Sequence, residues 1–327
     1  MKILAIVCTF QEADIIGWTV RHLKRQGCDV LVIDCESTDE TVMVAHTAGA
    51  EILRHPAPPV SWHELLRQVE KIAAGADADW IMHCDADELR YSRYPDDVLA
   101  QAFQNVQDSS FNAVDFQVLT FHPVDNGFDG SQDPEQYFRY YSDDPLNQRI
   151  GQVKAWRNVG PVSLAASGGH QVQFRGRRIC PVKFLSKHYP IRSQAHGERK
   201  VFEERKWLDQ ALGRQGWHVQ YNGIVPGHSF LKYPKCLMEW NRFSTPTYRR
   251  SWRPRPGCSP TAARSTWTAA RTAGSAARTS SATRGPAASA LACACSTSAA
   301  ASAMAPRCWR RRETASRRWI RRNSHWL

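Results

Sequence analysis

Three carboxylates follow a short apolar run in this sequence and could hold a divalent cation. Asp85, Asp87 and Glu88 come directly after residues 80–84, which have the pattern of a buried strand. Open α/β sheets bind ligands outside the carboxyl ends of their strands. Mg²⁺ and Mn²⁺ prefer oxygen ligands and often bridge to substrate phosphates. The pattern therefore predicts a metal site at a strand end, with an acidic turn that caps the next helix as the alternative.

Strands and helices alternate around these acids, and acids follow two further strands. Short apolar runs predict strands at residues 2–8, 29–33, 51–54 and 80–84. Apolar residues at helical spacing predict the helices between them, at residues 14–26, 40–48 and 61–74. This order predicts an α/β fold with a parallel sheet and right-handed crossovers. Glu12 and Asp34 follow the first and second strands, so we expect them on the same rim as Asp85 and Asp87.

Three segments together resemble a known family: Thr9-Phe10-Gln11-Glu12, Val32-Ile33-Asp34-Cys35-Glu36-Ser37-Thr38-Asp39 and Asp85-Ala86-Asp87. In their order and spacing they are similar to family 2 glycosyltransferases of the GT-A fold, over about residues 1–89. The resemblance implies a mostly parallel sheet flanked by helices, of the nucleotide-diphospho-sugar transferase type. It also implies a divalent metal, Mn²⁺ or Mg²⁺, as cofactor.

The family resemblance also implies roles for single residues. Thr9, Glu12 and Asp34 would hold the nucleoside, and the D-x-D acids Asp85 and Asp87 would serve the metal and the donor sugar. The sequence departs from the family pattern at two positions of these segments. Gln11 stands where Asn is common, and Cys35 stands where many members have a second Asp, which bears on base selectivity.

The second half contains one further suggestive stretch, the His-Tyr-Pro-Ile-Arg-Ser segment at residues 188–193. A strand is expected to end at His188, and Ser193 is expected to cap a helix that contains Lys200. The segment resembles a bacterial branch of the family. The resemblance implies that His188 binds the metal or the diphosphate, and that Arg192 and Lys200 clamp phosphate.

Transfer by an inverting enzyme needs a base that deprotonates the acceptor hydroxyl, and it needs no covalent nucleophile. Spacing does not select the base. The candidates are Asp125, Asp129, Asp133, Glu135 and His170. The aromatic stretch at residues 137–141 is either an acceptor wall or part of the core.

The net charge of +12 belongs to the C-terminal part of the chain. Residues 251–327 contain 14 Arg, no Lys and a single acid, whereas residues 1–250 are nearly neutral. The composition, with 19 Ala and 12 Ser in this stretch, is typical of a disordered basic arm or of out-of-frame translation of GC-rich DNA. We therefore expect one GT-A domain at 1–250, with a nucleotide-sugar half at 1–110 and an acceptor half at 111–250, followed by a low-complexity tail at 251–327.

The sequence thus predicts a metal-dependent, inverting glycosyltransferase. It would move a sugar from a nucleoside-diphosphate sugar, with UDP favoured, to a glycan or lipid-linked acceptor in surface polysaccharide or glycoconjugate synthesis. No apolar run reaches transmembrane length, and the ten cysteines show no paired spacing, which fits a reducing compartment. We therefore expect a cytoplasmic enzyme, compatible with peripheral attachment to the membrane and without a nucleic-acid partner. The alternatives are a non-catalytic nucleotide- or nucleic-acid-binding protein and an Asp-dependent phosphohydrolase.

Overall fold

A computed structural model describes residues 1–55, 62–94, 96–143, 151–205, 221 and 223–241, all of which lie within the unit Met1–Ser259. The tail predicted at 251–327 lies outside the described residues, as does Ser61, the residue before the third helix.

The first half folds as the sequence predicts, into four parallel strands linked by helices. The strands are β1 (Ile3–Thr9), β2 (Asp29–Asp34), β3 (Glu51–Arg54) and β4 (Trp80–Asp85). The linking helices are α1 (Ala13–Arg25), α2 (Thr41–Thr47) and α3 (Trp62–Gly75). Their spatial order in the sheet is β4-β1-β2-β3, and all three pairings are parallel. The α/β class expected from the sequence is confirmed.

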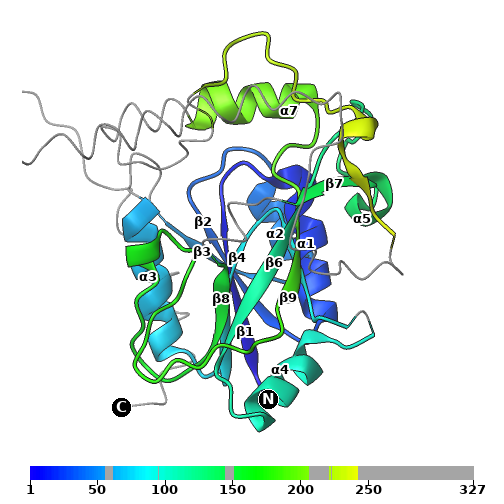
Figure 1. The fold of residues 1–327 in the computed structure, drawn as a ribbon. Coiled ribbons are helices and arrows are strands. Elements are labelled where there is room, and N and C mark those ends of the chain that lie inside the picture. The colour runs from blue at the N-terminus through cyan, green and yellow to red at the C-terminus, as the bar shows by residue number, and fades with distance from the viewer. Residues whose placement is uncertain (56–61, 95, 144–150, 206–220, 222, 242–327) are drawn as a thin grey trace, which may run out of the picture. The chain divides into compact units, whose positions relative to one another are not determined.

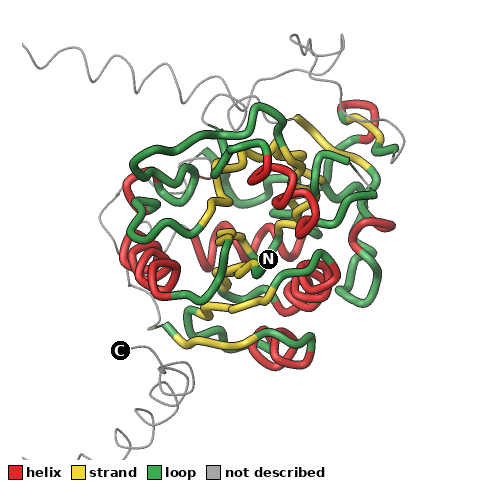
Figure 2. The backbone as a smooth tube through the Cα atoms, turned by 90° about the horizontal axis from the view of Figure 1, so that it is seen from below, coloured by secondary structure: helices red, strands yellow, loops and turns green. Residues whose placement is uncertain are grey.

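Strands β1, β2 and β4 are buried almost throughout, because helices cover both faces of this sheet. Apolar side chains of α1, of α2 and of α4 (Leu99–Asp108) pack together on one face, and those of α3 pack on the other. Figure 2 shows helices on either side of the strands. Helix α1 ends in a left-handed turn at Gly27, where φ is +83°. The next amide, of Cys28, donates back to the carbonyl of Leu23, which satisfies the last turn of the helix.

The second half extends the sheet with mostly antiparallel pairings. Its strands are β5 (Glu88–Tyr91), β6 (Ala113–Phe121), β7 (Tyr140–Asp143), β8 (Val153–Arg157), β9 (Phe184–His188) and β10 (Met238–Glu239). The main path runs β10-β7-β6-β8-β4-β1-β2-β3, and β9 pairs with both β5 and β6. Strand β8 lies antiparallel to β4, so the parallel region ends at β4. The short helices α5 (Pro134–Tyr137) and α7 (Gln194–Glu198), the 3-10 turns Ala165–Ser167 and Pro234–Cys236, and the π-helical turn η2 (Arg199–Arg205) complete the described elements.

The aromatic stretch at residues 137–141 contributes to a separate core rather than to an open wall. Phe138 and Tyr141 are buried with Phe121, Phe128 and Tyr189, among others. Stacked and tilted ring pairs join them, for example Phe121 with Tyr189 at 5.1 Å between centroids. This cluster supports the outer strands β6, β7 and β9.

Two features of this topology bring distant residues to one rim. The carboxyl ends of β1, β2 and β4 point to the same edge of the sheet, the edge near α7 in Figure 1. A tight turn after β4 leads into β5, whose pairing with β9 sets Glu88 opposite His188. His188 therefore reaches the D-x-D acids although a hundred residues separate them in the sequence.

Candidate functional site

Asp85 is the last residue of β4, and a buried lysine that spacing did not reveal holds it in place. Lys154, from the adjacent strand β8, donates from Nζ to Asp85 Oδ2 at 2.8 Å and also lies 3.3 Å from Glu88 Oε2. Glu88 is paired in turn with the buried Arg90. Burial would raise the pKa of Asp85, but the charge of Lys154 holds that pKa well below its usual range. A lysine between the apolar residues of a strand is the signal that could have identified Lys154 from the sequence.

Asp87 lies in the turn between β4 and β5 and contacts two of the residues predicted for this site. Its Oδ2 accepts from Lys200 Nζ at 3.0 Å, and its Oδ1 lies 3.6 Å from His188 Nε2. Burial would raise the pKa of Asp87, but Lys200 above all lowers it below the usual range. The structure thus places Asp87, His188 and Lys200 side by side. Ser193 caps α7 as the sequence predicts, because its hydroxyl accepts from the amide of His196.

Asp85, Asp87 and His188 offer carboxylate oxygens and one imidazole nitrogen at the rim, a donor set that suits Mn²⁺ or Mg²⁺. A third of the Asp85 side chain is exposed (32%), so the acid is open to a ligand on one side. The chemistry of these residues therefore fits the cation implied by the family resemblance.

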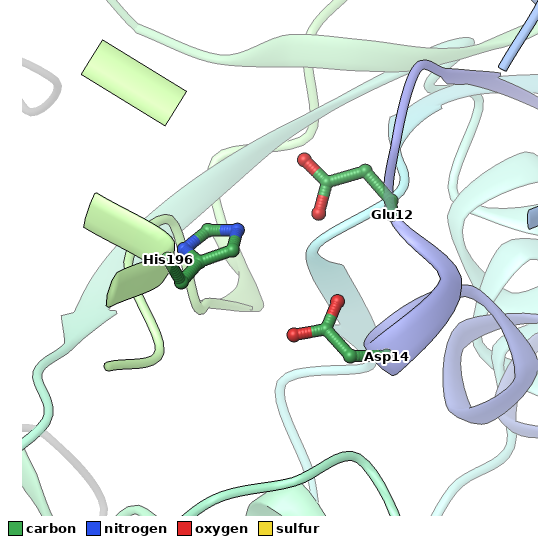
Figure 3. A group of neighbouring side chains, drawn as sticks. All are labelled: Glu12, Asp14 and His196. Carbon is green, nitrogen blue, oxygen red and sulfur yellow. The ribbon is translucent and has the colours of Figure 1, made fainter. Parts of the chain in front are cut away.

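A second group of acids resembles a metal site more closely in spacing. Within the described ranges, ligand atoms of Glu12, Asp14 and His196 all lie within 4.8 Å of one another. Figure 3 shows the two carboxylates at the start of α1 facing the imidazole of α7. Arg192 fills this place, since its Nη2 lies 2.7 Å from both Asp14 Oδ1 and His196 Nε2 and also donates to Glu12. The triad is therefore a guanidinium site.

Glu12 and Arg192 form a network of buried ion pairs. Both residues are buried, and both Glu12 oxygens have partners, Arg192 on one side and Lys200 at 2.9 Å on the other. Burial would raise the pKa of Glu12, but the two positive charges lower it to about 2. Arg192 also binds Asp14 with two nitrogens, as expected for a structural ion pair. Glu12 and Arg192 are thus paired with opposite charges in this structure, and their predicted contacts with the nucleoside and with phosphate stay predictions.

Thr9 and Asp34 remain at the rim as the sequence predicts. Asp34 Oδ2 accepts from Arg54 at 2.8 Å and from the amide of Ser37 at 3.1 Å. Asp34 Oδ1 and Thr9 Oγ1 are buried without a hydrogen-bond partner in the part of the chain that the structure describes. Buried polar atoms of this kind are costly unless a ligand or water satisfies them.

Gln11 joins the two loops of this rim. Its backbone is left-handed, with φ at +57°, and its side-chain oxygen accepts from the amides of Thr38 and Asp39. Its own amide donates to Ser37 Oγ. The side chain that replaces the more common Asn therefore fixes the loop after β2 against the loop after β1. Cys35, next to Asp34, is half-buried in the same loop.

The five candidates for the catalytic base separate into two groups. Asp125 accepts from Tyr137 and the Gly127 amide, Asp129 from Ser131, and Asp133 caps α5. Glu135 is paired with Lys187.

His170 differs from the other four because its surroundings include the D-x-D region. Its Nδ1 lies 3.2 Å from the side-chain amide nitrogen of Gln152. Burial and then the nearby charge of Lys154 lower the pKa of His170, with Asp85 acting in the opposite direction. A pKa below the ordinary value favours the neutral imidazole, the form that can accept a proton.

A family model and the curated relatives of this chain both point to glycosyltransferases. The model of the family "Glycosyl transferase family 2" matches residues 4–164, which include both rim loops, the D-x-D acids and Lys154. A protein named "Uncharacterized glycosyltransferase" from Rickettsia bellii is 30% identical over 124 residues, 38% of this chain and 40% of the relative. One of the same name from Rickettsia felis is also 30% identical, over 38% of this chain and 42% of the relative. The matched segment thus spans about two fifths of these relatives' length.

Solved structures show a more distant likeness. TarS 1–349 from S. aureus superposes with a TM-score of 0.36 at 13% identity, over 68% of this chain and 74% of that chain. Glucosyl-3-phosphoglycerate synthase from Mycobacterium tuberculosis, in complex with Mn²⁺, UDP and glucosyl-3-phosphoglycerate, gives 0.26 at 18% identity, over 37% of this chain and 44% of that chain. The family rests on the sequence match and on the strand-end loops described above. Residues 4–164 of this chain match glycosyl transferase family 2.

Proposed function

We propose that this protein transfers a sugar from a nucleoside-diphosphate sugar to an acceptor hydroxyl, with inversion and with a divalent cation. One observation carries the proposal. The unpartnered oxygens of Thr9 and Asp34 share a rim with Asp85, Asp87 and His188, inside a segment that matches the family. A polar floor for a nucleoside beside a cation site is the arrangement that a nucleoside diphosphate requires.

In this reading each residue of the rim has one task. Thr9 and Asp34 bind the nucleoside, and Asp85, Asp87 and His188 hold the cation. When bound, the cation would act as a Lewis acid for the charge that develops on the leaving diphosphate. Glu12 and Arg192 hold the loop after β1 against α7 and do not touch the donor. Lys154 fixes the carboxylate of Asp85 from behind.

Transfer as a single displacement needs a base on the acceptor side. We assign this role to His170, because it is the base candidate whose electrostatic surroundings include Asp85 and Lys154. A UDP donor, a glycan or lipid-linked acceptor and a cytoplasmic location remain proposals from the family resemblance. None of the described helices combines the length and apolar character needed to cross a membrane.

Calorimetric titration of UDP, GDP and dTDP into the full chain, with and without Mn²⁺, tests the proposal. We expect one nucleotide to bind in a Mn²⁺-dependent manner, and the Asp85→Ala/Asp87→Ala variant to lose this binding. Asp77→Ala is the matched control, because Asp77 is an exposed acid paired with Lys2. Failure of all three nucleotides to bind the folded wild type would refute the proposal.

A further inference from the structure

Lys200 bridges two acids that belong to different parts of the rim. Its Nζ lies 2.9 Å from Glu12 Oε1 and 3.0 Å from Asp87 Oδ2, and its side chain is almost completely buried. Glu12 precedes α1, whereas Asp87 belongs to the D-x-D turn. A buried ammonium of this kind is stable only while it keeps both partners or finds another anion.

Glu12 and Asp87 differ in the charged partners that each would keep if Lys200 moved away. Glu12 keeps Arg192 on its other oxygen, so its charge stays compensated. Arg192 is itself fixed by two bonds to Asp14 and cannot follow. Asp87, in contrast, has only the imidazole of His188, at 3.6 Å, as a further ion-pair partner among the described residues. A cation bound to Asp87 would therefore replace Lys200 in function and repel its ammonium.

We infer that Lys200 is an exchangeable counter-ion of Asp87: it neutralises Asp87 in the donor-free site, leaves it when the cation binds, and then contacts the donor diphosphate. The inference rests on the proposed function, which supplies the cation and the diphosphate. Lys200 is in this sense a competitor of the cation for Asp87 and a ligand of the donor.

The reach of the side chain allows this exchange. Metal–oxygen bonds of Mg²⁺ are about 2.1 Å long, so a phosphate that shares the cation with Asp87 lies within about 5 Å of its carboxylate. The ammonium of lysine is a point charge on a flexible four-carbon stem, and a rotamer change covers such a distance. A guanidinium held by two acids, as in Arg192, lacks this freedom.

Titration of Mn²⁺ alone into the full chain tests the first half of the inference. Lys200→Met removes the competing charge, so we expect Mn²⁺ to bind on the order of tenfold more tightly than to the wild type. Lys200→Arg keeps the charge and should leave the affinity close to that of the wild type. Lys183→Met is a further control, since Lys183 pairs with Asp115 and touches neither D-x-D acid.

Titration of UDP, GDP and dTDP at saturating Mn²⁺ tests the second half. We expect Lys200→Met to weaken the nucleotide that binds the wild type by about tenfold, because a charge-assisted contact to phosphate is lost. The two effects have opposite signs. General damage to the fold would weaken both affinities, and this result, or an unchanged Mn²⁺ affinity, would overturn the inference.

A measurement on the wild type covers the case in which Lys200→Met does not fold. Lysine acetylation read by mass spectrometry should show Lys200 more reactive in Mn²⁺ than in metal-free buffer, and protected again when nucleotide is added. Equal reactivity in all three states would overturn the inference. If the wild type shows no Mn²⁺-dependent nucleotide binding, the proposed function itself is refuted. Failure of the proposed function and failure of the inference about Lys200 are therefore distinguishable.

Discussion

Thr9 and Asp34 lie opposite each other at the ends of the paired strands β1 and β2, and each buries one oxygen that has no partner among the described residues. The other carboxylate oxygen of Asp34 is satisfied, since it accepts from Arg54 and from the Ser37 amide. An unsatisfied hydroxyl and an unsatisfied carboxylate oxygen at neighbouring strand ends mark a place that a polar ligand completes.

Replacement of Asp34 should therefore weaken nucleotide binding more than it weakens the fold. We expect Asp34→Asn to lower the affinity for the nucleotide that binds the wild type by about tenfold or more, since a charged acceptor is lost. Calorimetry measures this change. Asp29→Asn, at the exposed start of the same strand, is the matched control and should bind like the wild type. Equal affinities of the two variants would remove Asp34 from the nucleoside site.

Removal of the buried Lys154 should destabilise the protein strongly. Lys154→Met leaves Asp85 without its ion-pair partner at the end of a buried strand. Loss of one member of a buried pair typically costs about 3–5 kcal/mol in the free energy of unfolding, and the partial exposure of Asp85 places this variant near the lower value. Urea denaturation of the full chain measures the change. A loss below about 1 kcal/mol would show that solvent compensates Asp85.

Acid should destabilise the protein through Glu12. Its pKa is about 2 in the folded state against an ordinary value of 4.5, so the unfolded state binds the proton first as the pH falls. The stabilisation is complete above pH 4.5 and is lost as the pH falls from there towards about 2. Glu12→Gln should be less stable than the wild type at pH 7 and should show a shallower loss between pH 5 and pH 3. Parallel curves for the two proteins would contradict the assignment.

His83 should lower the free energy of unfolding. It is buried in β4, and neither of its ring nitrogens has a partner among the described residues. Burial lowers its pKa to about 4, so the unfolded state gains a proton below pH 6.5 and stability falls between pH 6.5 and pH 4. We expect His83→Leu to raise the free energy of unfolding by about 1 kcal/mol at pH 7 and by more at pH 5. A decrease at pH 7 would indicate that a water or ligand binds the ring.

The sequence was sufficient for the parts of the protein that depend on local pattern. Apolar runs and helical spacing located β1 to β4 and α1 to α3 within one or two residues, and the carboxyl ends of those strands placed Asp34 and Asp87 on one rim. The strand that ends at His188 and the cap at Ser193 also follow from local signals.

Pairing between distant segments was not accessible in the same way. The spacing of residues in the sequence does not show that Lys154 of β8 lies beside Asp85. Nor does it show that Arg192 pairs with Glu12 and Asp14, some 180 residues away. Charged side chains select partners by three-dimensional packing, and a lone basic residue in a sequence is compatible with solvent, phosphate or carboxylate. For the same reason the sequence alone does not show that Arg192 pairs with the carboxylates of Glu12 and Asp14.

The shared guanidinium of Arg192 has a consequence for engineering. One side chain binds two acids at the start of α1 and a histidine of α7. The residues of these two segments therefore depend on each other and cannot be exchanged separately. A chimera that takes residues 12–14 from one relative and residues 192–196 from another would place a buried charge without its counterpart. Segment exchange within this family should therefore keep both segments from the same parent.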